Sequence, residues 1–218
     1  MPTVRAAAGV LLCVAALAAS GCATGPGEET PAGVNLAGTW KLDAGASDDP
    51  QKALAQMRAE ALKLMNRQLQ AHGQEPLPHT GNRGEGPGQA DLLQRSPMAH
   101  VIMESVARGD FLTIRQRPGE FVLDYGTSVR RFTPGAHSVV SAEGGVGDQS
   151  SGWKGHEYVI EIRAQSGPAV TETYGLSADG KHLTEKLHIA AWELPAVTLT
   201  RVYNPTTEIA PRQLPNND

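Results

Sequence analysis

The stretch FLTIRQRPGEFVLDYGTSVRRFT, residues 111–133, alternates apolar with polar side chains and is divided by short turn sequences. Alternation with a period of two predicts half-buried β-strands, and Arg-Pro-Gly-Glu between two such runs predicts a hairpin turn. The same pattern recurs before and after this stretch. The predicted strands cover residues 36–43, 111–117, 121–126, 128–133, 137–142, 156–164, 169–177, 181–189 and 196–204. Eight or nine strands in up-and-down order indicate a mainly β chain whose antiparallel strands form a barrel.

A helical region interrupts this pattern after the first strand. Residues 47–73 place apolar side chains at helical spacing, with candidate N-caps just before Pro50 and with Gly73 past the last turn. These signals predict an amphipathic helix that packs on the rest of the domain. We therefore expect the barrel domain to cover residues 35–204, with a helical insertion at 47–107.

Three other segments have weaker patterns. Residues 74–88 are rich in Gly, Pro and polar residues and predict a long, mobile loop. Residues 90–109 predict either a short helix broken at Pro97 or a helix followed by a strand. The sequence GGVGDQSSGWKG, residues 144–155, predicts a flexible hairpin loop.

The beginning of the sequence has the layout of an export signal. Arg5 precedes an uncharged run of 14 residues, 6–19, and small residues follow it. The run is too short for a membrane span, which needs roughly 20 residues, but it fits a secretory signal. Because Cys13 lies inside this signal, the mature chain would keep Cys22 alone, with no partner for a disulfide and no second thiol for a metal.

The sequence ASGC, residues 19–22, resembles the lipobox of bacterial lipoproteins. The resemblance implies a lipoprotein signal peptide at residues 1–21 and several acyl chains on Cys22, which would hold the chain stably on a membrane. In that family an Asp after the cysteine favours the inner membrane, so Ala23 and Thr24 imply the outer membrane, on its periplasmic face. The alternative is an ordinary secretory signal, which would give a soluble periplasmic or secreted protein.

Both flanks of the predicted domain have the composition of unstructured chain. Residues 22–34 are rich in Gly, Pro and charge and predict a flexible tether. The 12 residues after Cys22 could span roughly 40 Å at about 3.3 to 3.6 Å per residue. Residues 205–218 predict a Pro-rich, disordered tail.

The charge balance argues against nucleic acid as a partner. Without residues 1–21 the chain has 18 basic and 23 acidic residues, a net charge of −5, and no basic run. Such a chain lacks the positive surface that binds phosphate backbones or anionic head groups. We therefore expect it to contact the membrane through the lipid anchor alone.

Three positions suggest a particular kind of barrel. Gly38 and Trp40 open the first predicted strand, and Arg201 interrupts the apolar face of the last one. This arrangement resembles the lipocalins, in which a Gly-X-Trp sequence begins the first strand and an arginine from the last strand lies across the tryptophan. The resemblance implies that these residues close the barrel, with a stabilisation of roughly 0.5 to 2 kcal/mol from the cation–π contact. The sequences GTWKLDAGASDDP, residues 38–50, and YGLSADGKHL, residues 174–183, also resemble an uncharacterised family of bacterial secreted proteins.

No pattern in the sequence predicts catalysis or a cofactor. None of the seven histidines has the His-x-x-x-His or His-x-His spacing of a metal site. Ser150 and Ser151 lack the spacing of a nucleophile elbow, and no glycine run precedes a Lys-Ser or Lys-Thr pair. We therefore expect no catalytic residue, no metal site and no cofactor, and a protein that is not an enzyme.

Two carboxylates occupy apolar strand faces. Glu172 alternates with Val170 and Tyr174, and Glu185 alternates with neighbouring leucines. A buried carboxylate needs a partner, and Arg201 is available. One reading is that these groups form a structural ion-pair network or face outward. The other is that Glu172, Glu185 and Arg201 form a polar anchor in a cavity for a small apolar or amphiphilic ligand.

The sequence therefore leaves two functional hypotheses. The first is a membrane-anchored periplasmic lipoprotein whose barrel binds such a ligand. The second is a protein-interaction or structural module of the cell envelope, which would use the loop 74–88 and the tail.

Overall fold

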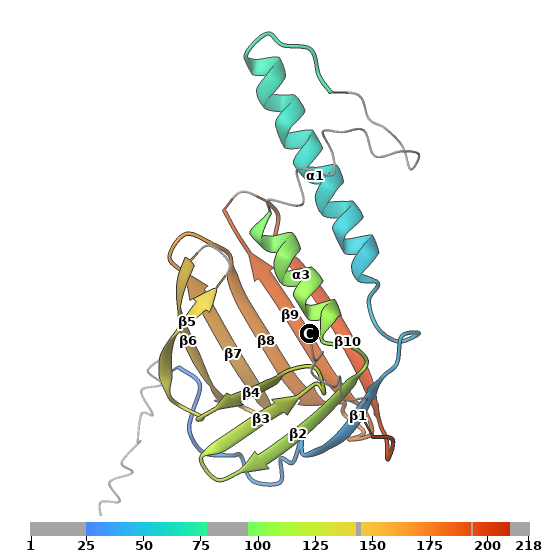
Figure 1. Ribbon diagram of the computed structural model, residues 1–218, viewed down its shortest axis with the longest axis vertical. Helices are drawn as coiled ribbons and strands as arrows, with labels where there is room; N and C mark the ends of the chain where they lie inside the picture. Colours follow the sequence, from blue (N-terminus) through green and yellow to red (C-terminus); the bar gives the residue numbers. More distant parts are fainter. Residues whose placement is uncertain (1–24, 78–95, 143–144, 193, 210–218) are drawn as a thin grey trace, which may run out of the picture.

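The computed structural model describes residues 25–77, 96–142, 145–192 and 194–209. Within these residues the chain is mainly β: ten antiparallel strands form a half-barrel, and two helices follow the first strand (Figure 1). This confirms the predicted fold class and the position of the helical insertion. The signal, the lipobox, most of the loop 74–88 and most of the tail lie outside the described residues.

The sheet has the expected up-and-down order. Its strands are β1 (Gly38–Leu42), β2 (Phe111–Arg117), β3 (Glu120–Asp124), β4 (Val129–Phe132), β5 (His137–Ala142), β6 (Gly145–Lys154), β7 (Glu157–Ala164), β8 (Ala169–Leu176), β9 (Leu183–Ala190) and β10 (Val197–Pro205). The hydrogen-bonded order is β4-β3-β2-β1-β10-β9-β8-β7-β6-β5. The first and last strands are therefore neighbours in the middle of the sheet, with Leu42 opposite Tyr203, and β4 and β5 are its two edges.

Strand β6 corrects one prediction. The interpretation of residues 144–155 as a flexible hairpin loop is wrong, because β6 pairs with both β5 and β7. The prediction was wrong because glycines are typical of loops, but one glycine of β6 lies where neighbouring chain segments leave little room for a side chain. A Cβ at Gly147 would lie 3.1 Å from the Cβ of Ala142 and 3.3 Å from the carbonyl oxygen of Arg163. A glycine inside a strand often marks such a close approach.

The first helix begins where the sequence predicts it, whereas the second begins at Pro97, where the sequence predicts a break. Helix α1 (Pro50–Ala71) is capped by Asp49, whose side chain accepts a hydrogen bond from the Gln51 amide at 2.8 Å. Helix α3 (Pro97–Ala107) is capped by Ser96. Pro97 therefore begins a helix instead of breaking one, as proline at the first helical position allows. Residues 90–95, which the prediction also assigned to this region, lie outside the described part of the chain.

The inward side chains form two apolar clusters. The first is rich in aromatic rings and comprises Leu36, Trp40, Leu112, Ile114, Phe121, Leu123, Tyr125, Phe132, Trp153, Tyr158, Ile160, Tyr174, Leu183 and Tyr203. The second packs α1 and α3 on the sheet and comprises Ala53, Leu54, Met57, Met98, Ala99, Val101, Ile102, Val170, Leu187, Ile189 and Leu199. In the first cluster, the rings of Phe121 and Tyr158 stack at 3.7 Å and Trp153 meets both edge-on. Side chains therefore fill the part of the barrel interior that the first cluster occupies.

Residues 25–36, which we call the strap, lie against the barrel. Gly27 and Trp153 exchange two backbone hydrogen bonds, of 2.8 and 2.9 Å. Further along, the Leu36 amide donates to the side chain of Gln116, which in turn donates to the carbonyl of Val34. The part of the predicted tether that the structure describes is thus hydrogen-bonded to β2 and β6.

The barrel has two distinct ends. The strap runs along one end, which we call the strap end, together with the turns 118–119, 133–136 and 155–156 (Figure 1). The opposite end, which we call the helix end, contains α1, α3 and the loop 191–196 after β9. Because β9 is antiparallel to β8, its last residue lies at the opposite end from the last residue of β8.

Candidate functional site

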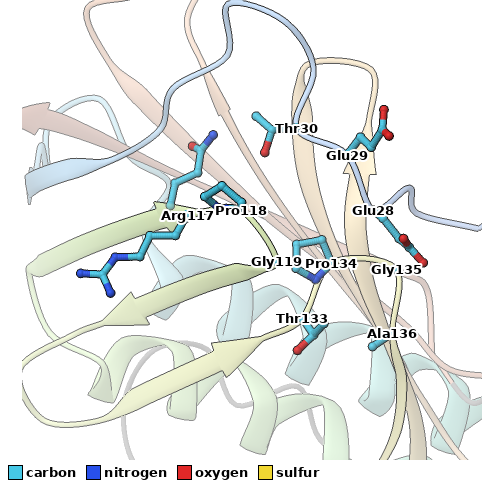
Figure 2. Close-up of a pocket in the computed structure, with 11 residues that line it drawn as sticks. Glu28, Glu29, Thr30, Arg117, Pro118, Gly119, Thr133, Pro134, Gly135 and Ala136 are labelled. Atoms are coloured by element: carbon cyan, nitrogen blue, oxygen red, sulfur yellow. The ribbon is translucent and has the colours of Figure 1, made fainter.

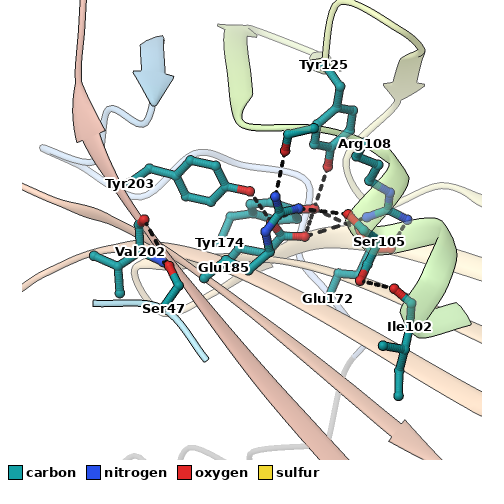
Figure 3. Close-up of polar contacts among 12 residues, drawn as sticks. Ser47, Ile102, Ser105, Arg108, Tyr125, Glu172, Tyr174, Glu185, Val202 and Tyr203 are labelled. Atoms are coloured by element: carbon teal, nitrogen blue, oxygen red, sulfur yellow. Dashed lines mark hydrogen bonds and ion pairs between the residues drawn. The ribbon is translucent and has the colours of Figure 1, made fainter. Parts of the chain in front are cut away.

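A layer of charged and phenolic side chains lies where the two apolar clusters meet, and its three tyrosines also belong to the first cluster. We call it the polar layer, and Figure 3 shows most of its side chains. It comprises Arg108, Tyr125, Arg130, Glu172, Tyr174, Glu185, Arg201 and Tyr203. The strand residues among them point inward because they share the period-two faces that hold the core, as Glu172 does with Val170 and Tyr174 on β8.

Glu172 is the most heavily bonded member of the layer. It is 2% exposed, and Arg108 and Arg130 donate to its two carboxylate oxygens at 2.9 and 2.5 Å. The hydroxyl of Tyr174 donates to it at 2.9 Å. Burial opposes the charge of this carboxylate, but Arg130 and Arg108 outweigh burial and lower the pKa of Glu172 to about 2. Glu172 is therefore ionised at neutral pH.

Glu185 is fully buried and is held mainly by phenols. The hydroxyl of Tyr203 donates to it at 2.7 Å, and Arg201 lies 3.9 Å away. The Tyr174 hydroxyl also lies 3.2 Å from Glu185, although its single proton goes to the nearer carboxylate, Glu172. In the 2.9 Å contact between the two tyrosines, Tyr174 is therefore the acceptor and Tyr125 the donor. Burial and the charge of Glu185 raise the pKa of Tyr125 to about 12, so this phenol keeps its proton.

Arg201 connects the polar layer to α3. It donates to the carbonyls of Ser105 and Gly109 at 2.9 and 2.6 Å, at the C-terminal end of the helix, where positive charge is favourable. Its guanidinium lies 5.4 Å from the ring centre of Tyr203. The lipocalin resemblance implied that Arg201 lies across Trp40, but among the described residues its ring contact is with Tyr203. The Trp40 indole donates to the carbonyl of Leu36. Arg201 thus fixes the helix on the sheet.

A cavity of about 170 Å³ opens beside this layer, under α3 and next to the sheet edge β5. Its polar wall is formed by Arg108, Arg130 and Glu172. The rest of its lining is Val101, Glu104, Val140, Ser141, Ala142, Gln149, Ile162, Pro168 and Val170. The cavity therefore has a charged inner wall, and its sides combine apolar residues with the polar Glu104, Ser141 and Gln149.

Arg108 has unused hydrogen-bonding capacity on this wall. Its side chain is 9% exposed, yet the buried Nη1 atom has no hydrogen-bond partner among the described residues. The nearest carboxylate oxygen, on Glu185, is 3.6 Å away, beyond hydrogen-bond length. The layer as a whole holds three arginines and two glutamates. The cavity lining itself balances two arginines against Glu104 and Glu172, so what lies beside the cavity is a residue with an unused buried donor.

A larger cavity, of about 810 Å³, lies at the strap end, between the strap and the turns 116–119 and 133–136 (Figure 2). Its charged side chains, Glu28, Glu29 and Arg117, are exposed. Exposed charges are well solvated and contribute little to binding. The smaller cavity is therefore the better candidate for a specific site.

The structure brings together all three predicted ligand-binding candidates, since Glu172, Glu185 and Arg201 belong to the polar layer. It also adds arginines that the prediction missed. Arg130 could have been found, because it shares the inward face of β4 with Phe132. Arg108 follows α3 and has no periodic signal. The position of Cys22 lies outside the described residues.

The histidines and other metal-binding side chains are dispersed. His182 pairs with Asn204 and His188 with Thr198, both away from the polar layer. Within the described ranges, no three His, Cys, Asp or Glu side chains are close enough together to hold a metal ion. In the same part of the chain, no helix has the length and apolar character to cross a membrane.

Comparisons with known proteins give only distant structural likenesses. No family model and no curated protein matches the chain. The apo lipid binding protein 8 of Caenorhabditis elegans has a TM-score of 0.45 and 12% identity, covering 80% of this chain and 100% of its own. The zebrafish ileal bile acid-binding protein with cholic acid has a TM-score of 0.40 and 15% identity, covering 78% and 98%. A secretory abundant heat soluble protein from Ramazzottius varieornatus has a TM-score of 0.40 and 11% identity, and the match covers 78% of this chain and 95% of that protein. At these values we draw no functional conclusion from the likeness.

Proposed function

We propose that this chain is a binding protein, not an enzyme, and that it holds a small amphiphile with an anionic head group in the cavity beside the polar layer. The observation that carries this proposal is that Arg108 lines the cavity and has a buried Nη1 with no hydrogen-bond partner among the described residues. An unsatisfied buried donor is costly, and a bound carboxylate or phosphate oxygen would satisfy it with a charge-assisted hydrogen bond.

The dimensions of the cavity restrict the ligand. Ligand pockets commonly measure about 300 to 1,000 Å³, and this cavity has about 170 Å³. It therefore has room for a head group and the first part of an apolar tail. The sides offered to the tail are Val101, Val140 and Ile162, and the tail would leave beside the unpaired edge of β5.

The proposal includes the membrane anchor that the sequence predicts. Acyl chains on Cys22 would hold the protein on the outer membrane, facing the periplasm. The support is the lipobox resemblance together with the short export signal. Intact mass of the membrane-extracted protein tests it: we expect acyl chains on the wild type and neither modification nor membrane association for Cys22→Ser. An unmodified wild type would refute the anchor.

The ligand proposal is tested with three probes that share one eight-carbon tail. Octanoate, octanol and octylamine are titrated into the protein by calorimetry. We expect octanoate to bind best, because it alone brings a negative charge to Arg108, and octylamine not to bind. Equal binding of the three probes would contradict an anionic head-group site.

A matched pair of variants on β5 locates the site. Val140 lines the cavity, whereas its neighbour Val139 is 71% exposed on the other face of the strand. Val140→Trp should fill the cavity and weaken octanoate binding at least about tenfold, or 1.4 kcal/mol. Val139→Trp should leave it unchanged. Octanoate binding that is unaffected by Val140→Trp would place the ligand elsewhere.

A second candidate function, an interaction module of the cell envelope, is favoured by Trp192. This side chain is 89% exposed in the loop after β9, at the helix end. Exposed tryptophan is enriched at protein interfaces. A photo-crosslinking residue at position 192 should capture one protein in cells, whereas the same residue at the exposed Gln165, also at the helix end, should not. Identical products at both positions would count against this function.

A further inference from the structure

The strap is attached to the barrel at both of its ends. Gly27 continues the hydrogen-bonding of β6 by pairing with Trp153, beyond the point where β5 begins. At its other end Leu36 is fully buried in the aromatic cluster. The strap is therefore held at both ends.

Two glycines make room for the strap where it crosses the sheet. At Gly152, a Cβ would collide with the carbonyl oxygen of Gly27 and lie 3.0 Å from the carbonyl carbon of Pro26. At Gly135, with φ of +81°, a Cβ would collide with the side chain of Glu28, and Figure 2 shows these two residues side by side. A side chain at position 152 would therefore displace the strap backbone, whereas one at position 135 would displace the side chain of Glu28.

The strap shortens the free chain between the lipidated residue and the barrel. The sequence alone allowed roughly 40 Å of tether, but only five residue steps separate Cys22 from Gly27. Five residues span at most about 18 Å when fully extended. The bilayer surface must therefore lie close to the strap end of the barrel.

We propose that the strap end is a membrane-facing surface, and that the barrel stands on the bilayer that holds the acyl chains of Cys22. This inference rests on the anchor in the proposed function. In this orientation α1 and α3 point away from the membrane, at the far end of the barrel (Figure 1). The exposed Trp192, in the loop after β9, lies at that same end. The cavity beside the polar layer, lined by α3, then exchanges ligand with the aqueous side.

Two labelling positions test the orientation. Ala178 is exposed in the turn after β8, at the strap end, and Gln165 is exposed in the turn after β7, at the helix end. The eight residues of β8 separate these turns by about 26 Å at roughly 3.3 Å per residue. Acylated Cys22 cannot react with maleimide, so Ala178→Cys and Gln165→Cys each accept one fluorophore on the full acylated chain.

The labelled proteins are reconstituted in vesicles of phosphatidylethanolamine and phosphatidylglycerol that contain a quencher on the lipid head groups. We expect the fluorophore at position 178 to lose most of its fluorescence and the one at position 165 to lose little. Equal quenching in protein whose mass shows acylation would overturn the orientation alone. A mass without acyl chains would overturn the anchor and the orientation together.

A glycine pair then tests the strap itself. Gly152→Ala should release the strap and remove the difference between the two labels, because the longer free chain lets the barrel tumble. Gly155→Ala is the control: its φ is also positive, at +58°, but a Cβ there meets nothing within 4 Å. Gly155→Ala should therefore keep the difference. A difference that survives in folded Gly152→Ala would refute the role of the strap.

Discussion

The substitution Glu172→Gln removes the charge at the centre of the polar layer while keeping the shape of the side chain. In the wild type, Arg108 and Arg130 both donate to this carboxylate. The amide of glutamine offers one oxygen acceptor and no charge. The buried Arg108 and the partly buried Arg130 then lose the carboxylate that they share, and Glu185, 3.6 Å from Arg108, remains as a negative charge.

Two independent arguments give the size of the effect. Removing one partner of a buried ion pair costs about 3 to 5 kcal/mol. The pKa of Glu172 falls from 4.5 to about 2 on folding, and at about 1.4 kcal/mol per pKa unit this corresponds to roughly 3 kcal/mol. We expect Glu172→Gln to lose roughly 3 kcal/mol of the free energy of unfolding at pH 7, a large part of the 5 to 15 kcal/mol typical of a domain.

The pH dependence has a defined sign. The folded-state pKa lies below the unfolded one, so the carboxylate stabilises the folded state fully above about pH 5 and loses this contribution as the pH falls toward 2. At low pH the protonated acid resembles the amide. The difference between the wild type and Glu172→Gln should therefore shrink steadily from pH 5 to pH 2.

Urea unfolding followed by circular dichroism measures these values on the unacylated chain. The control is Glu161→Gln, which removes a pair with Lys154 on the surface, where both side chains are partly exposed. We expect this control to lose at most about 1 kcal/mol. Equal losses in the two variants, or a difference that stays constant down to pH 2, would refute the reasoning about the polar layer.

Three further substitutions test the fold. Asp49→Ala should cost about 1 kcal/mol in urea unfolding, because it removes the cap of α1; no loss would mean that the cap is not formed in solution. Phe121→Ala should cost about 3 to 5 kcal/mol, since this fully buried ring stacks on a tyrosine, and a loss below 1 kcal/mol would contradict the packed interior. Gly180→Ala should lower the melting temperature, because φ is +70° in the turn before β9; an unchanged value would argue against this turn geometry.

The sequence predicted the strands well because short runs with strand character are separated by turn sequences. Most runs alternate inward and outward side chains, although β3 buries Phe121, Val122 and Leu123 in succession. The prediction failed at β6, whose glycines resemble a loop when only local composition is considered. The reason for Gly152 is visible only in three dimensions, where the strap passes over it. The strap itself has a linker's composition. Its backbone hydrogen bonds to Trp153 and its contacts with the side chain of Gln116 leave no signal in the local sequence.

The candidate site was predictable in part for a similar reason. Glu172 and Glu185 stand out because they are charges on apolar strand faces. Their partners do not, since Arg108 and Arg130 lie 64 and 42 residues away from Glu172 along the chain. Only the folded sheet and α3 bring them together. The same packing places Arg201 on the carbonyls of α3 and over Tyr203, which the resemblance to lipocalins did not indicate.

The most direct test of the proposed function is a crystal structure of the protein with octanoate. We predict that a carboxylate oxygen lies about 3 Å from Nη1 of Arg108, with the tail along Val140 and Ile162 and the ion pairs of Glu172 intact. Octanoate bound in the larger cavity at the strap end, or no bound octanoate at saturating concentration, would contradict the proposed site.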